Sequence, residues 1–254
     1  MRVLALFAHP DDAEFLCGGT LAHLAARGAR IGIATMTAGD CGSTSLPATR
    51  ITRQRKGEAR RAARLIGAAY TCLEEKDLAV FYDLRTLRKV MELVRKTRAD
   101  LVLSHSPVDY MVDHETTSRL AQTACFGAMA PNFRTGAPRA ARALAAVPWL
   151  YYAAPFGGRD ILGVEISSRL FVDISDTFAR KAEMLACHKS QRAFLREQQG
   201  IADPLEMQRQ MAEGAGRAAG LPLAEGFRQH LGQGFPQNNR LAEWLPNLVR
   251  KAGR

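Results

Sequence analysis

Short apolar runs alternate along the chain with longer stretches in which apolar residues recur at helical spacing. The short runs predict β-strands at residues 3–7, 30–36, 69–73, 100–104, 149–153 and 169–174. The longer stretches predict helices at residues 17–28, 52–66, 83–98, 113–129 and 175–198. Strands that alternate with helices of this length predict an α/β fold, with a mostly parallel sheet covered by helices on both faces.

Three segments lack either pattern. Residues 37–47 are rich in Gly, Ser and Thr, which predicts a loop, and residues 131–148 are irregular. The chain after Gly200 is rich in Gly, Gln and Arg, which predicts loops and short helices. Asp113, or a residue near it, is expected to cap the helix that begins there.

The composition is typical of a globular protein. Apolar residues make up 47% of the 254 residues and charged residues 24%, which excludes a disordered or collagen-like chain. The apolar runs are too short for a transmembrane helix. The first residues predict a buried strand and not a signal peptide, so we expect a cytoplasmic protein. The 5 cysteines are widely spaced, which argues against a disulfide framework.

The net charge of +10 comes from 35 basic and 25 acidic residues. Basic residues are frequent between Arg50 and Arg64, where they could form a solvated helix face or meet an anionic partner. Because no aromatic residues interleave this run, we expect no nucleic-acid partner. The charge favours an anionic small molecule, and a homo-oligomer stays open.

Two polar segments follow predicted parallel strands. His9, Asp11 and Asp12 come directly after the first strand, and Asp113 and His114 come after the fourth. Ligands of open α/β sheets bind beyond the carboxyl ends of the strands, so these side chains can meet. Two imidazoles and one carboxylate with an open position are typical of a catalytic zinc site. The same set also forms the triad of ferrous oxygenases, which keeps iron as an alternative.

These segments resemble the PIG-L/LmbE family of zinc-dependent amino-sugar deacetylases. The resemblance rests on His9-Pro10-Asp11-Asp12, Gly18-Gly19-Thr20, the Thr37–Ser43 loop, Arg55 with Glu58, Asp113-His114 and His188-Lys189-Ser190-Gln191. It implies a Rossmann-like three-layer sandwich. It also implies a deacetylase domain at residues 1–200, with a C-terminal extension at residues 201–254 packed on the same domain.

The resemblance implies a role for each matching residue. His9, Asp12 and His114 would bind one zinc ion, and Asp11 would be the general base. Asp113 would orient a catalytic side chain, and Arg55 and Asp40 would contact an N-acetylated substrate. The structural alternatives are that Asp11 shapes the turn, that Asp113 only caps its helix, and that Arg55 pairs with Glu58.

Met111 is a departure from the family. The family has His-x-Asp-His where this chain has Met111-Val112-Asp113-His114, and a thioether cannot donate a useful hydrogen bond. The first His would stabilise the oxyanion, so another donor is needed. His188 and His105 are the two candidates, and we favour His188. Met111 would then line the substrate site, unless the chain is a catalytically weakened binding protein.

Overall fold

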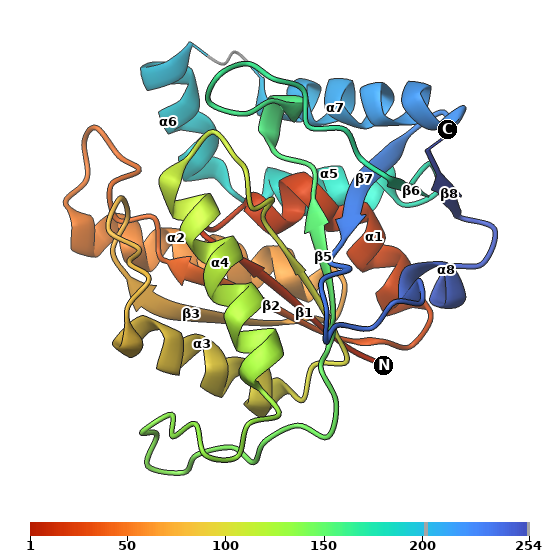
Figure 1. Cartoon of the computed structure of the whole chain (residues 1–254). Helices are drawn as coiled ribbons and strands as arrows, with labels where there is room; N and C mark the ends of the chain where they lie inside the picture. Colours follow the sequence, from red (N-terminus) through yellow and green to blue (C-terminus); the bar gives the residue numbers. More distant parts are fainter. Residues whose placement is uncertain (201–202, 253–254) are drawn as a thin grey trace.

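The computed structural model describes residues 1–200 and 203–252, and one sheet of eight strands runs through it. The strand order is β3-β2-β1-β4-β5-β7-β6-β8 (Figure 1). The strands are β1 (Arg2–Phe7), β2 (Arg30–Thr37), β3 (Ala69–Glu75), β4 (Leu101–Ser104), β5 (Trp149–Ala153), β6 (Leu170–Asp173), β7 (Ala224–Gln229) and β8 (Val249–Lys251). The first five strands pair in parallel, and the last three pair antiparallel, which confirms a mostly parallel sheet.

Helices cover both faces of this sheet, which confirms the Rossmann-like three-layer prediction. One face carries α1 (Asp12–Ala26), α2 (Ala48–Arg64), α5 (Phe178–Ala186), α7 (Pro204–Ala219) and α8 (Arg240–Trp244). The other face carries α3 (Leu84–Thr97) and α4 (Val112–Gly127). The remaining helices are α6 (Lys189–Gln199), which contacts α2, and the short 3₁₀ turn η1 (Phe156–Gly158).

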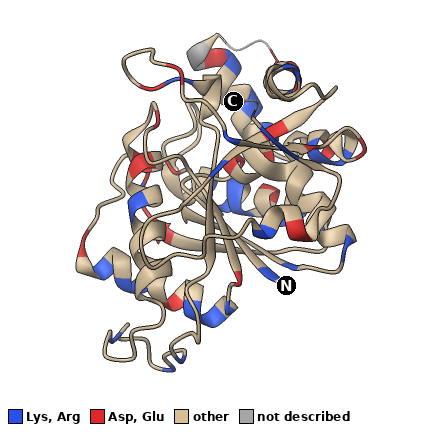
Figure 2. Cartoon of the chain, turned by 45° about the vertical axis from the view of Figure 1, so that its right-hand side comes forward, with Lys and Arg blue, Asp and Glu red and all other residues tan. Residues whose placement is uncertain are grey.

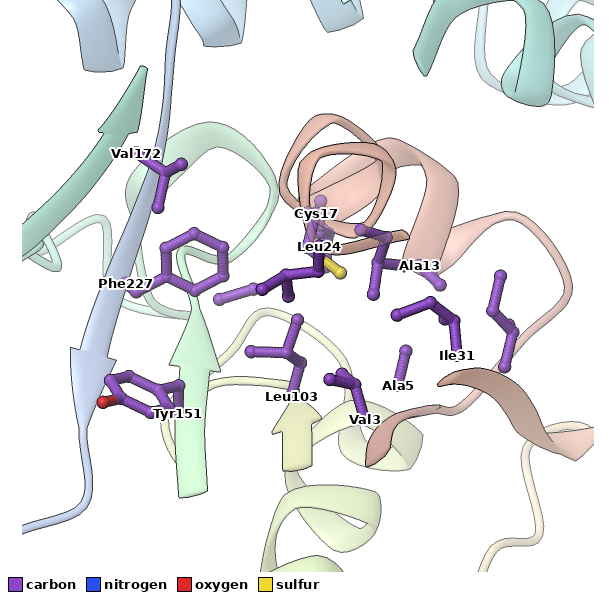
Figure 3. Packing of buried hydrophobic residues seen from close by; sticks show 14 of the residues in the cluster. Val3, Ala5, Ala13, Cys17, Leu24, Ile31, Leu103, Tyr151, Val172 and Phe227 are labelled. Atoms are coloured by element: carbon purple, nitrogen blue, oxygen red, sulfur yellow. The ribbon is translucent and has the colours of Figure 1, made fainter. Parts of the chain in front are cut away.

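Each face of the sheet has its own core because side chains of a strand alternate between the two faces. Val3, Ala5 and Phe7 of β1 face α1, and Leu4 and Leu6 face α3 and α4. Figure 3 shows Val3, Ala5 and Leu103 beneath Leu24 of α1. Burial on both faces explains why the parallel strands are nearly continuous apolar runs in the sequence.

The C-terminal part of the chain differs from its prediction. Residues after Gly200 were expected to be loops and short helices, but they include the long helix α7 and strand β7. Strand β7 lies between β5 and β6, so this part completes the sheet. Of the predicted extension at 201–254, residues 201–202 and 253–254 lie outside the described residues.

Two predictions about helices were also wrong. The single helix at residues 175–198 is two helices, α5 and α6, which are separated at Cys187 and His188. Asp113 does not cap α4, because Met111 occupies the N-cap position and Asp113 lies inside the first turn. The carboxylate of Asp113 is used elsewhere, in the site described next.

Candidate metal centre

The site lies where the strand order reverses. From β1 the chain continues to β2 on one side, and β4 lies on the other side. The connections after β1 and β4 therefore diverge, which leaves a crevice at the carboxyl ends of these two strands. His9 follows β1, and His114 stands in the first turn of α4, which follows β4.

Three ligand atoms converge in this crevice. Nδ1 of His9 lies 3.3 Å from Nε2 of His114 and 3.4 Å from Oδ2 of Asp12. Nε2 of His114 lies 3.7 Å from the same oxygen. Ligands about 2.0–2.2 Å from a tetrahedral zinc ion lie roughly 3.3–3.6 Å apart. The three spacings lie in or close to this range, so the cluster is able to bind a metal ion.

A carboxylate orients each of the two imidazoles. Oδ2 of Asp113 lies 3.3 Å from Nε2 of His9, and it also accepts the backbone N–H of Leu78 at 2.7 Å. Oδ1 of Asp109 lies 2.9 Å from Nδ1 of His114. With one ring nitrogen held by a carboxylate, the other nitrogen of each ring faces the crevice. Such carboxylate–histidine pairs are usual behind metal ligands.

His105 packs against His114 and so supports the same arrangement. Its ring is fully buried and stacks on the ring of His114, with centroids 3.8 Å apart and an interplanar angle of 10°. The backbone N–H of Ala8 donates to its Nε2 at 3.0 Å. Burial lowers the pKa of His105 to about 4, so the ring is neutral at physiological pH.

The cluster attracts positive charge. Burial alone lowers the pKa of His9, but hydrogen bonds to Asp113 and Asp12 raise it to about 10. Burial would raise the pKa of Asp12, but the charge of His114 and a hydrogen bond with His9 hold it well below its usual range. The carboxylates thus stabilise a cation at this point, which a divalent ion can supply in place of the imidazole proton.

Asp11 lies beside the three ligand atoms in a rare backbone conformation. Its φ is 109° and its ψ is −24°, an unusual conformation for a residue with a side chain. Burial raises the pKa of Asp11 to about 6, against the opposing charge of Arg55. The closest guanidinium nitrogen of Arg55 lies 3.7 Å from Oδ1 of Asp11.

Arg55 reaches the site from α2 through a passage bounded by glycines. Its guanidinium is buried and donates to the carbonyl oxygens of Pro10, at 3.0 Å, and Gly39, at 3.4 Å. A Cβ atom at Gly39 or Gly42 would collide with this guanidinium, which explains the small residues in the Thr37–Ser43 loop. Arg55 is therefore close enough to hold Asp11, and its guanidinium lines the cavity.

A cavity of about 470 Å³ opens over the cluster. Its described lining includes six residues of the predicted site, namely His9, Asp11, Asp12, Arg55, Met111 and His114. Asp113 lies behind His9, as a positioning residue would. The structure thus brings together most of the residues that the sequence singled out.

Two predicted residues are not among the described residues that line this cavity. The carboxylate of Asp40 accepts the backbone N–H of Asp77 at 3.0 Å and pairs with Lys76 at 3.3 Å. His188 is fully buried at the start of α6, where its Nε2 lies 3.4 Å from Oε1 of Glu14. The roles predicted for Asp40 and His188 stay predictions.

The sequence interpretation did not assign Asp109, and it treated His105 only as a candidate donor. Both lie between β4 and α4, so their places at the carboxyl end of a central strand were a usable signal. A ligand histidine usually has a carboxylate behind it, which could have directed attention to Asp109, five residues before His114.

Residues 4–125 match the family model described as PIG-L, GlcNAc-PI de-N-acetylase. The chain is similar to the PIG-L family over this region, which is just under half of its length. The matched region contains both ligand segments and ends within α4. The family model describes a deacetylase, which is a hydrolase acting on amides, and these matches identify the chain as an enzyme.

Three similar proteins extend the comparison beyond residue 125. A 4-oxalmesaconate hydratase of Pseudomonas putida is 24% identical over 89% of this chain and 87% of its own length. The structure of GalB, a 4-carboxy-2-hydroxymuconate hydratase of Pseudomonas putida, has a TM-score of 0.76 at 23% identity, over 94% of this chain and 99% of its own. An N,N'-diacetylchitobiose deacetylase of Pyrococcus horikoshii also has a TM-score of 0.76, at 24% identity, over 90% of this chain and 83% of its own.

The basic residues of the described part of the chain are spread over several helices. Figure 2 shows Lys and Arg on several helices, interspersed with Asp and Glu. On α2, Arg53, Arg60, Arg61 and Arg64 are exposed, whereas Arg55 points inward to the site. Within the described residues, no helix combines the length and the apolar character needed to cross a bilayer.

Proposed function

We propose that this protein is a metal-dependent N-deacetylase that hydrolyses the acetamide of an N-acetylated amino sugar or a related small molecule. One observation carries the proposal: His9, Asp12 and His114 present ligand atoms 3.3–3.7 Å apart, with Asp11 beside them at the base of a cavity. A metal position with an adjacent carboxylate is what amide hydrolysis by an activated water requires.

Zinc is the metal we propose, with ferrous iron as the alternative. A bound divalent ion of this kind lowers the pKa of water toward about 7 and polarises an amide carbonyl. His9, Asp12 and His114 would hold it, while Asp113 and Asp109 keep the two imidazoles in the required orientation.

Asp11 moves the proton in this proposal. Its carboxylate accepts a proton from the water as the water oxygen bonds to the amide carbon. The same carboxyl group then gives this proton to the amine nitrogen as the C–N bond breaks, which yields acetate and a free amine. Arg55, 3.7 Å away and anchored to Pro10 and Gly39, keeps Asp11 in place.

This mechanism also needs a hydrogen-bond donor that stabilises the oxyanion. Met111 lines the cavity at the position where the family has a histidine, and its thioether cannot serve. We keep His188 as the proposed donor, which requires its buried ring to turn from Glu14 toward the cavity. His188→Ala then lowers kcat by about 10²–10³ without loss of metal. Full activity in this variant would contradict the role.

A hydratase is the second candidate, because some of the matches that cover nearly the whole chain are named as hydratases. Their named substrates carry several carboxylates. Among the described residues that line the cavity, Arg55 is the single Arg or Lys side chain, beside Asp11, Asp12 and Asp77. This balance disfavours a polycarboxylate and favours a neutral amide.

A single assay separates these candidates. Zinc-loaded protein is incubated with a set of N-acetylated sugars and, separately, with unsaturated polycarboxylates, and both acetate release and loss of the double bond are followed. We expect acetate release, and we expect Asp12→Asn to abolish it by weakening metal binding. Hydration without acetate release would refute the deacetylase. Metal binding without either reaction would identify a binding protein.

A further inference from the structure

Three aromatic rings from separate parts of the chain form one wall of the cavity. Phe15 comes from α1, Tyr110 from the loop before α4, and Phe156 from η1. The ring centroids of Phe15 and Phe156 are 5.4 Å apart, and those of Tyr110 and Phe156 are 5.9 Å apart. The Tyr110 ring also stands edge-on to His114, with centroids 5.2 Å apart. This aromatic wall therefore begins at a metal ligand.

Much of the rest of the cavity is apolar as well. Six more apolar side chains line it, namely Leu16, Leu78, Met111, Phe194, Leu195 and Met207. The polar side chains are those of the metal cluster with Asp11, Arg55, Asp77 and Gln191, and the guanidinium of Arg55 already donates to two backbone carbonyls. A free sugar has a hydroxyl on nearly every carbon, and this lining offers those hydroxyls few partners.

A second cavity of about 680 Å³ lies next to Met207, which lines both. Its lining mixes apolar residues of α7, among them Met211 and Ala218, with the charged Arg159 and Glu165. The apolar character of the first cavity therefore extends as far as Met207.

We propose that the substrate is an acetamide whose amine part carries an aryl or alkyl group, which packs on the aromatic wall of Phe15, Tyr110 and Phe156. The proposal rests on the deacetylase function proposed above. The apolar group lies beside the metal cluster, and longer groups reach toward Met207. The aromatic wall thus selects amphiphilic acetamides over free N-acetyl sugars.

The test uses a series of methyl, butyl and hexyl glycosides of N-acetylglucosamine with zinc-loaded protein. Each methylene that becomes fully buried tightens binding by up to about fourfold. We expect kcat/KM for acetate release to rise at least tenfold from methyl to hexyl. Equal values along the series would overturn the proposal.

Phe156→Ser tests the aromatic wall directly. It should lower kcat/KM for the hexyl glycoside at least fivefold and change kcat/KM for the methyl glycoside by less than twofold. The matched control is Phe81→Ser. The Phe81 side chain is 62% exposed and is not among the described residues that line the cavity. This variant should leave the preference for the hexyl glycoside unchanged. A hexyl preference that survives Phe156→Ser and disappears in Phe81→Ser would also overturn the assignment.

Binding separates this proposal from the proposed function. The deacetylated methyl, butyl and hexyl glucosaminides are titrated calorimetrically, and their affinities should increase with chain length. If affinity increases but no acetamide is hydrolysed, the deacetylase fails and the apolar site stands. If acetate is released but affinity and kcat/KM stay flat, the apolar site fails and the deacetylase stands.

Discussion

Asp11 adopts a backbone conformation that costs free energy. A φ of 109° in a residue with a side chain costs of order 1–3 kcal/mol, and such residues cluster at functional sites. This turn also directs the Asp11 carboxylate to the cavity next to the ligand Asp12. Strain at this position is consistent with a direct role for the carboxylate.

Asp11→Asn separates proton transfer from metal binding. Asparagine tolerates positive φ comparatively well and keeps the side-chain shape, but it cannot accept the proton. We expect turnover to fall by roughly 10²–10⁴ while metal content stays near that of the native protein. Acetate release and elemental analysis measure the two quantities. Full activity with native metal content would assign Asp11 a structural role only.

Asp109→Asn tests the positioning of His114. The amide can no longer hold the ring as a carboxylate does, so metal affinity should fall by about 10–100-fold. Competition with a chelator measures this change, and Asp113→Asn should weaken the metal similarly through His9. Asp176→Asn, at an exposed carboxylate, serves as the control. Unchanged affinity in Asp109→Asn would show that packing alone orients His114.

At the residue scale, the sequence predicted those site residues whose positions follow from local spacing in the chain. His9 and Asp12 share one turn after a strand, and His114 begins a helix after another, so topology alone brings them together. The surroundings of Asp40 and His188 depend on partners far along the chain, Lys76 and Glu14, and no local pattern indicates them.

At the scale of helices and strands, the Gly18-Gly19-Thr20 motif of α1 stabilises the packing of the fold. The helix is interrupted at Cys17, whose φ of −143° is not helical. The N–H groups of Gly19 and Thr20 donate instead to the carboxylate of Glu225, at 2.9 Å and 2.7 Å. Lys181 pairs with the same carboxylate at 2.6 Å. The Gly18-Gly19-Thr20 motif therefore joins α1 to α5 and β7.

Gly19→Ala should destabilise the protein. A Cβ atom at this position would lie 2.7 Å from Cγ2 of Ile174, which is too close without a shift of the helix. We expect a loss of about 1–3 kcal/mol in the free energy of unfolding, measured by denaturant titration. Gly57→Ala in α2 is the matched control, because its Cβ has room and alanine favours a helix. Equal stability of the two variants would contradict the close approach.

The spacing of apolar residues predicted most of the helices and strands, because each of them buries at least one face. It placed β5 at its observed bounds and α3 within one residue at each end. It missed the break between α5 and α6, since the apolar spacing continues across Cys187 and His188. It also missed strand β7, whose Glu225 is buried by pairing with Lys181 and the α1 backbone.

At the scale of the whole molecule, the metal cluster lies at the carboxyl ends of two adjacent central strands of the sheet. Its ligands lie at the starts of α1 and α4, after the adjacent strands β1 and β4. The sequence predicted this meeting from the alternation of strands and helices. The insertion of β7 between β5 and β6 could not be predicted, because antiparallel pairing over this distance leaves no periodic signal.

Metal binding should therefore stabilise the whole fold. The three ligands meet only in the folded chain, so zinc at 100 times its dissociation constant adds about 2.7 kcal/mol. For a domain of this size, that raises Tm by roughly 5–11 °C, which calorimetry with and without zinc measures. Asp12→Asn removes a ligand and should abolish most of this shift, whereas the exposed Asp176→Asn should retain it. An equal zinc shift in the native protein and in Asp12→Asn would mean that zinc binds elsewhere, and the metal centre would have to be abandoned.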